Sequence, residues 1–188
     1  MATATLPERR ITPDQFAELP NNEAYELVDG ELVERGEMGL ESQKIGHEIA
    51  RHIGNYAAEF GGESFGDGSP FRAFGPLGDD ILKPDAAYVV PGRMDAIPEG
   101  VGELAPDLMV EVISPSDNSY DVEEKAQTYL AAGVRAVWVV HPNVRMLQEI
   151  RADGDRRVFR VGDSVVCEDI LPDFAMELAS VFPALPPT

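Results

Sequence analysis

An apolar run that contains one acid constrains this chain more than any other stretch. Residues 108–113 read Leu-Met-Val-Glu-Val-Ile, and Pro106 and Pro115 lie on either side of them. A short apolar run bounded by prolines predicts a strand that is buried on both faces. A carboxylate in such a strand is costly unless a metal, a cation or a hydrogen-bond donor pairs with it. The residue that most needs an explanation is therefore Glu111.

The stretch after this strand predicts a βαβ unit. Asp121 and Glu124 form a capping signal for a helix over residues 122–132. Residues 135–140 read Arg-Ala-Val-Trp-Val-Val and predict a second buried strand. A strand, a helix and a strand over this length predict two parallel neighbours joined by a right-handed crossover.

A further short strand is expected before residue 108. Asp85 follows Pro84 and opens the apolar residues 86–90, and a loop that contains proline and glycine then leads to the strand of Glu111. Consecutive short strands joined by a loop usually lie side by side. We therefore expect Asp85 and Glu111 on neighbouring strands.

The N-terminal part predicts a short helix and a hairpin. Thr12 and Gln15 form a capping-box pattern, and Asp29-Gly30 lies between two strand-like runs in residues 25–34. Glu26 belongs to the first of these runs. It could face solvent or point into a cleft, and its spacing alone favours solvent.

The longest predicted helix spans residues 41–60, with Ser42 as its N-cap and an apolar face at three- and four-residue spacing. His47 and Arg51 lie four residues apart on another face of this helix. They are candidates to contact a phosphate at the rim of a site. An ordinary exposed polar face explains the same spacing equally well.

The C-terminal third predicts a hairpin of residues 144–150 and 157–161, followed by a short helix that includes Phe174 and Leu178. The hairpin carries the only concentration of basic residues in the chain, which comprises Arg145, Arg151, Arg156, Arg157 and Arg160. We expect one domain over residues 1–188, with a core of about residues 11–182, a loose N-terminal arm and a C-terminal tail.

Composition limits the possible partners. The formal net charge of −19 argues against long-range attraction to nucleic acid, although a local basic patch or a metal could still recruit a polyanion. We find no transmembrane run and no signal peptide. The single cysteine, Cys167, excludes an internal disulfide and is expected in the core. These features predict a cytoplasmic protein without membrane contacts.

Asp85, Glu111 and Lys125 form the candidate constellation. Two carboxylates from neighbouring strands can hold Mg²⁺ or Mn²⁺, and such a metal polarises a phosphodiester and activates a water. A nearby lysine could orient that water or stabilise charge on the phosphate in the transition state. A purely structural ion pair between Glu111 and Lys125 explains the same residues, and spacing alone does not choose between the two.

The order of motifs resembles the Uma-two restriction-endonuclease-like family of the PD-(D/E)XK nuclease superfamily. The matching residues are Tyr25-Glu26, Asp29-Gly30, Pro84-Asp85, the block Glu111-Val-Ile-Ser114-Pro115-Ser116, Lys125 with Tyr129, Ala132-Gly133 and Trp138. The resemblance covers roughly residues 11–182. It implies an α/β (α+β) fold with a mixed central sheet flanked by helices and with N-terminal and C-terminal β-hairpins, often as a homodimer.

The resemblance also implies site residues. It implies a divalent metal, Mg²⁺ or Mn²⁺, at Asp85 and Glu111. The chain departs from the superfamily pattern at Ile113, which occupies the position of the motif lysine. The resemblance implies that Lys125 supplies the missing amine from the following helix and that Glu26 is an additional acid.

These features together predict a magnesium-dependent DNA endonuclease in which Asp85, Glu111, Lys125 and Glu26 are catalytic. One alternative is a binding or assembly protein that keeps the fold without catalysis, which the net charge of −19 favours. Another is a metal-dependent hydrolase of a smaller phosphoester. Hairpin arginines gathered on the cleft side would favour the nuclease.

Overall fold

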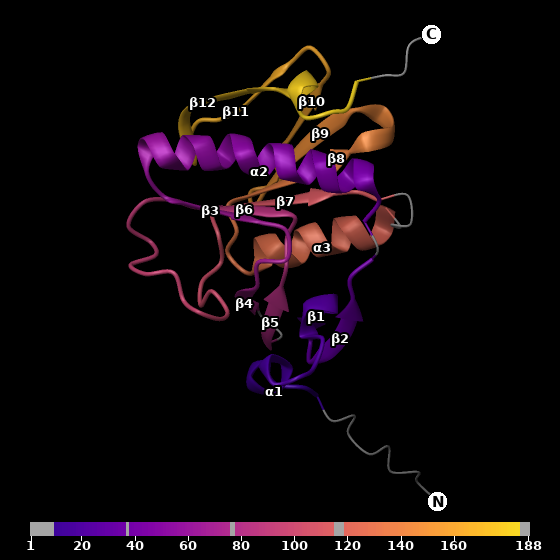
Figure 1. The fold of residues 1–188 in the computed structure, drawn as a ribbon, viewed down its shortest axis with the longest axis vertical. Helices are drawn as coiled ribbons and strands as arrows, with labels where there is room; N and C mark the ends of the chain where they lie inside the picture. Colours follow the sequence, from indigo (N-terminus) through magenta and orange to yellow (C-terminus); the bar gives the residue numbers. More distant parts are fainter. Residues whose placement is uncertain (1–9, 37, 76–77, 115–118, 185–188) are drawn as a thin grey trace, which may run out of the picture.

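A six-stranded mixed sheet forms the centre of the computed structural model, which describes residues 10–36, 38–75, 78–114 and 119–184 (Figure 1). The strands follow the order β10-β9-β8-β7-β6-β3. Their bounds are β3 (Glu63–Gly66), β6 (Ala86–Val89), β7 (Leu108–Val112), β8 (Ala136–His141), β9 (Met146–Arg151) and β10 (Arg156–Arg160). The sheet thus confirms the expected mixed architecture.

The centre of this sheet is the predicted βαβ unit. β7 pairs in parallel with β8, and α3 (Ser119–Ala131) connects them. β6 lies antiparallel on the other side of β7, with Ala86 opposite Val110. These three strands are almost wholly buried, because helices cover both of their faces. Asp85, directly before β6, and Glu111 of the neighbouring β7 are therefore brought side by side, as expected.

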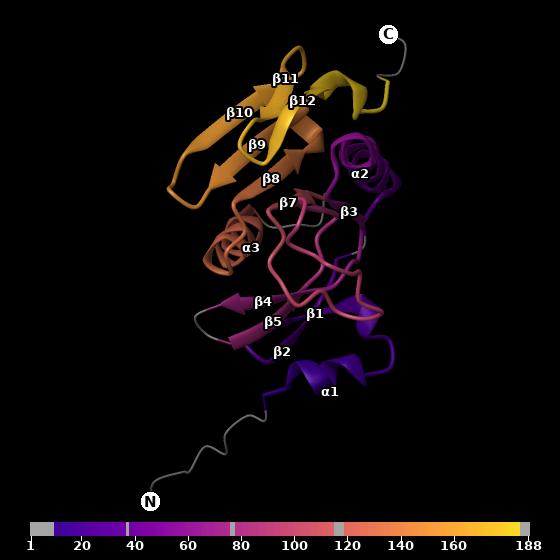
Figure 2. The same ribbon diagram turned by 90° about the vertical axis from the view of Figure 1, so that its left-hand side faces the viewer.

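α2 (Leu40–Phe60) and α3 cover opposite faces of the sheet (Figure 2). Ile45, Ile49 and Ile53 of α2 pack on the face that also carries Trp138 and Val110. The other face carries Val137, Met109 and Val139, and it packs against Ala126 and Tyr129 of α3. The alternation of side chains along β7 directs Glu111 to the α3 face.

A second, four-stranded sheet lies beside the α3 face, in the order β2-β1-β5-β4 (Figure 2). It contains β1 (Tyr25–Val28), β2 (Glu31–Glu34), β4 (Phe71–Gly75) and β5 (Gly78–Leu82). The predicted hairpin turn is confirmed, because Asp29 and Gly30 have φ values of 51° and 76°, as a type I′ turn requires. The capping box at Thr12 begins α1 (Pro13–Ala17) as predicted.

The C-terminal part holds a hairpin that the sequence analysis missed. β11 (Ser164–Cys167) pairs with β12 (Leu171–Glu177), and the expected helix is only the single 3₁₀ turn η3 (Leu178–Ser180). Two other 3₁₀ turns are η1 (Asn22–Ala24) and η2 (Pro142–Val144). The predicted hairpin β9–β10 is confirmed, and Cys167 is fully buried as expected.

Two predicted helix caps are wrong. Gly39 precedes the first residue of α2, and the hydroxyl of Ser42 instead donates to the Ile113 carbonyl at 3.2 Å. Ser119 is already helical, so Asp121 lies inside α3 rather than at its N-cap. Pro115 and Ser116 of the matched block, most of the N-terminal arm and the end of the tail lie outside the described residues. The extent of the domain stays a prediction.

A buried carboxylate on the α2 face has a structural role. Glu149 is completely buried, accepts a hydrogen bond from the Trp138 indole at 2.9 Å and pairs with Arg151 at 3.0 Å. Arg151 also binds Asp169 through two nitrogens, both at 2.8 Å. This network joins the β9–β10 hairpin to the β11–β12 hairpin. No helix in the described part of the chain is long and apolar enough to cross a membrane.

Gly62, just after α2, provides a test of this packing. Its φ is +87°, and a Cβ there would lie 2.6 Å from the carbonyl oxygen of Val89 and 2.5 Å from the Tyr88 hydroxyl. Gly92 has a similar φ of +80° but open space around it. We expect Gly92→Ala to lower the free energy of unfolding by about 1–2 kcal/mol, from backbone strain alone. Gly62→Ala should cost about 1–3 kcal/mol more, because β6 must shift.

Urea denaturation followed by circular dichroism measures both changes. Gly100→Ala is the control, since Gly100 lies in a loop and has neither a positive φ nor any atom within 4 Å of its added Cβ. Equal losses in Gly62→Ala and Gly92→Ala would contradict the close approach of α2 to β6.

Candidate active site

Glu111 is compensated by two side chains of α3. The ammonium of Lys125 lies 3.0 Å from Glu111 Oε2, and the hydroxyl of Tyr129 donates to Glu111 Oε1. Lys125 and Tyr129 are four residues apart on α3, so one helix face presents both to the carboxylate. Burial raises the pKa of Glu111 and outweighs the opposing effect of Lys125. Both oxygens of this costly carboxylate are thus engaged.

Glu26 reaches the same lysine from the second sheet. Glu26 Oε2 lies 3.2 Å from the Lys125 ammonium, and Glu26 Oε1 accepts the backbone N–H of Lys83 at 2.6 Å. Only 5% of Glu26 is exposed, so its assignment to the solvated face of the hairpin is wrong. The resemblance, which implied an additional acid here, predicted its position better than the local spacing did.

Asp85 enters the site from the start of β6. Its backbone N–H donates to the Val110 carbonyl at 3.0 Å, and its Oδ2 accepts the N–H of Val112 at 2.6 Å. Among the described contacts, no hydrogen bond engages the other oxygen, Oδ1. Burial raises the pKa of Asp85 to about 8, and the nearby Glu111 carboxylate adds to the rise. We call Glu26, Asp85, Glu111, Lys125 and Tyr129 the site cluster.

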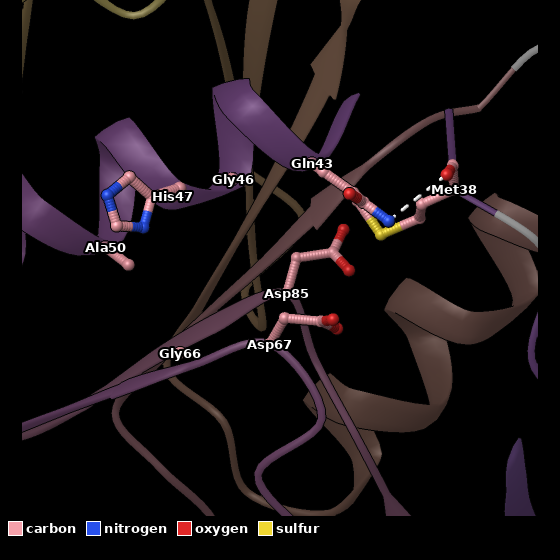
Figure 3. A pocket seen from close by; sticks show the side chains of 8 residues that line it. All are labelled: Met38, Gln43, Gly46, His47, Ala50, Gly66, Asp67 and Asp85. Carbon is pink, nitrogen blue, oxygen red and sulfur yellow. Dashed lines mark hydrogen bonds between the residues drawn. The ribbon is translucent and has the colours of Figure 1, made fainter. Parts of the chain in front are cut away.

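A pocket of about 300 Å³ opens beside Asp85 (Figure 3). It is lined by Met38, Gln43, Gly46, His47, Ala50, Gly66, Asp67 and Asp85. Gly46 brings α2 close to Asp85, since a Cβ on Gly46 would lie 3.6 Å from the Asp85 Cβ. Asp85 is the member of the site cluster that lines the pocket. A ligand in the pocket would therefore reach the cluster through Asp85.

Arg35 and Asp67 form an ion pair beside this pocket. Arg35 follows β2, and its backbone N–H donates to the Ala24 carbonyl at 2.9 Å. Burial alone would lower the pKa of Arg35, but Asp67, Glu26 and Asp85 raise it above its ordinary value. Neither residue was predicted from the sequence, because neither belongs to a recognisable motif. Tyr129 appeared there only as a neighbour of Lys125 and as part of the resemblance.

The charges of the site cluster suit a divalent cation. Three carboxyl groups face one ammonium, so the fully ionised cluster carries a charge of −2 from Glu26, Asp85, Glu111 and Lys125. Carboxylate oxygens are the ligands that Mg²⁺ and Mn²⁺ prefer. Within the described ranges no group of three or more His, Cys, Asp and Glu side chains is arranged to hold a metal ion. A metal here would depend on Asp85, Glu111 and waters.

The two candidate phosphate contacts on α2 are separated. His47 lines the pocket, whereas Arg51 is not among the lining residues. The guanidinium of Arg51 pairs with Glu48 at 2.8 Å, one turn back along the helix. The structure thus brings His47, but not Arg51, to the space beside Asp85.

The hairpin arginines do not form one basic surface. Glu111, Val139 and Gln148 are successive partners across the sheet, and Val158 pairs with Gln148. Arg156 and Arg160 alternate with Val158 and so share the α3 face, whereas Arg157 lies on the other face. Of the remaining two, Arg151 belongs to the Glu149 network and Arg145 donates to the Pro183 carbonyl at 2.9 Å.

Comparison with known proteins identifies the class to which this fold and site belong. The model of the Uma2 family, described as "Putative restriction endonuclease", matches residues 13–179. This match covers most of the chain, and the chain belongs to the Uma2 family. The resemblance inferred from the motifs is thereby confirmed.

A solved structure has the same fold. The crystal structure described as a "putative nuclease belonging to DUF820" from Anabaena variabilis ATCC 29413 superposes with a TM-score of 0.78 at 20% sequence identity. The similarity covers 92% of this chain and 97% of that chain. No match is found among the curated proteins. Family and fold together support a nuclease.

The raised pKa of Asp85 predicts a pH-dependent stability. An unfolded aspartate releases its proton near pH 4, whereas the folded chain holds it until about pH 8. Between these values the folded state binds more protons than the unfolded state, so this group makes stability fall as pH rises. Asparagine cannot ionise. In EDTA, the free energy of unfolding of Asp85→Asn minus that of the wild type should show a gain of at least about 1 kcal/mol between pH 5 and pH 8.

Urea denaturation at several pH values measures this gain. Asp155→Asn, in the exposed turn of the β9–β10 hairpin, is the control and should show none. A wild-type-minus-variant difference that stays constant from pH 5 to pH 8 would refute the raised pKa.

Proposed function

We propose that this chain is a metal-dependent DNA endonuclease whose active centre is the site cluster. The observation that carries the proposal is that Glu26 and Glu111 both contact Lys125 and that Asp85, close to this group, lines a pocket. Glu26 and Glu111 come from two different strands, Asp85 directly precedes a third, and Lys125 comes from a helix. A buried structural ion pair would need one carboxylate for one lysine. Glu26 and Asp85 each also accept a backbone N–H, but neither is needed to neutralise Lys125, because Glu111 alone would do so.

Each residue has a distinct proposed role. Asp85 and Glu111 would hold Mg²⁺ or Mn²⁺, which when bound polarises the phosphodiester and lowers the pKa of a water. Lys125 is kept charged by two carboxylates, so it acts as a donor that stabilises negative charge on the phosphate. Tyr129 orients Glu111, and Glu26 orients Lys125. His47 is a candidate contact for an adjacent phosphate on the pocket wall.

The net charge of −19 supports a second candidate, a binding or assembly protein without catalysis. The scattered hairpin arginines also agree with this alternative, since a continuous basic surface is what normally attracts DNA. A smaller phosphoester as substrate would need less basic surface. Only the nuclease produces nicked DNA, so this product distinguishes it from both alternatives.

Cleavage of supercoiled plasmid at low salt with Mg²⁺ or Mn²⁺ tests the proposal. We expect the wild type to convert plasmid to the nicked form, and Asp85→Asn, Glu111→Gln and Lys125→Met each to lower the rate at least about 100-fold. Asp155→Asn should cleave like the wild type, because its side chain is exposed far along the β9–β10 hairpin. Chelation by EDTA should abolish cleavage.

Folding of each variant is checked by circular dichroism, and metal binding by the shift in the unfolding temperature with added Mn²⁺. A folded wild type that binds metal but never nicks DNA would favour the binding protein. Nicking that survives in Asp85→Asn would place the chemistry elsewhere. The homodimer and the cytoplasmic location stay predictions, and light scattering after size exclusion would test the former.

A further inference from the structure

Arg35 lies where a substrate phosphate would approach the site cluster. Its backbone is fixed beside β1 by the hydrogen bond to Ala24, two residues before Glu26. Its guanidinium reaches the loop after β3, where Nη1 is 3.3 Å from the position of a Cβ on Gly68. The N–H of Gly68 in turn donates to the carbonyl of Pro84, the residue before Asp85, at 3.3 Å. Arg35 does not itself line the pocket, but its guanidinium pairs with Asp67, which does, and Glu26 and Asp85 lie close enough to raise its pKa.

The partner that Arg35 has in this structure is easy to replace. Asp67 lines the pocket, and 56% of its side chain is exposed, against 21% for Arg35. An ion pair with one well-exposed member contributes little to stability. Asp67 can turn to solvent at small cost, whereas Arg35 stays held beside β1. A phosphate oxygen pair has the same bidentate geometry as a carboxylate and carries at least as much charge.

A cation on this side would favour the approach of a phosphodiester in addition to a metal at Asp85 and Glu111. Asp67 lies on the pocket wall and would repel a phosphate, as would Asp85 when it is ionised and holds no metal (Figure 3). Lys125, held by Glu26 and Glu111, is assigned to the scissile phosphate itself, and Arg51 pairs with Glu48 and does not line the pocket. Arg35 can be released by the movement of a single exposed carboxylate.

We propose that Arg35 is a phosphate-binding residue of the active centre and that Asp67 occupies it until DNA arrives. The phosphate of a nucleotide next to the scissile bond takes the place of Asp67 on the guanidinium. This inference rests on the proposed function, since it assigns a DNA phosphate to the same site. It also explains how a chain with a charge of −19 presents a cation to DNA without a basic surface.

A purely structural role makes a different prediction. If the Arg35–Asp67 pair only ties β2 to the loop after β3, removing either partner should have the same effect. If Arg35 binds phosphate, the two changes should have opposite effects. Arg35→Gln removes the binding group, whereas Asp67→Asn frees it and removes a competing charge.

Fluorescence anisotropy with a labelled DNA duplex, with Ca²⁺ in place of Mg²⁺, separates these roles. We expect Arg35→Gln to weaken binding about tenfold or more at low salt. The slope of log K against log salt concentration should fall by about 0.9, the value for one phosphate contact. Asp67→Asn should bind as tightly as the wild type or several-fold more tightly. The double variant should bind like Arg35→Gln.

Two further variants serve as controls for this measurement. Arg157→Gln removes an arginine that pairs with exposed Asp155 on the sheet face opposite Glu111, and it should leave affinity and slope unchanged. Arg35→Lys keeps the charge but loses the planar fork, so it should keep the slope and bind with intermediate affinity. Urea denaturation identifies any variant that fails to fold, and Arg35→Lys then stands in for Arg35→Gln.

The outcomes distinguish the inference from the function on which it rests. A folded wild type with no affinity for the duplex would overturn the proposed DNA substrate itself. A wild type that binds DNA, together with Arg35→Gln of equal affinity and slope, would overturn only the role of Arg35. Equal losses in Arg35→Gln and Asp67→Asn would show a structural tie and would also overturn that role.

Discussion

The compensation of Glu111 is the interaction on which the rest of the site depends. A carboxylate in a central, largely buried strand of the sheet is tolerable only because Lys125 and Tyr129 engage both of its oxygens. Both side chains belong to α3, so this helix must cross the sheet at the position that places them over Glu111. The parallel pairing of β7 with β8 provides that position, because the crossover helix packs back over the strands that it joins.

The second sheet adds what the βαβ unit alone lacks. β1 brings Glu26 to Lys125, and β5 leads through Lys83 and Pro84 directly into Asp85 and β6. The backbone N–H of Lys83 holds Glu26, so the same short link positions both acids. Arg35 directly follows β2, the second strand of the hairpin that carries Glu26. The acids and their neighbouring cations are therefore coupled through the backbone, and movement of the small sheet would disturb them together.

Local sequence patterns predicted many of the elements. They failed where the placement of a side chain depends on a partner that is distant in the sequence. The capping box at Thr12, the turn at Asp29-Gly30 and the strand around Glu111 depend on neighbouring residues, and all three are confirmed. Ser42 has the residue type of an N-cap, yet its hydroxyl serves the Ile113 carbonyl across the core. The alternation of residues along β1 predicts an exposed Glu26, yet Glu26 is buried and pairs with Lys125 of α3.

The sequence by itself determined the central βαβ unit, the adjacency of Asp85 and Glu111, and the membership of a nuclease-like family. It could do so because apolar runs, turn residues and motif order act over short range or are visible in the chain directly. Only the tertiary structure decided that Glu26 is buried, that His47 and not Arg51 lines the pocket, and that Arg35 pairs with Asp67 of the pocket wall. These facts depend on how two sheets and a helix meet, since charges separated along the chain interact only once packing has brought them together and removed the water between them.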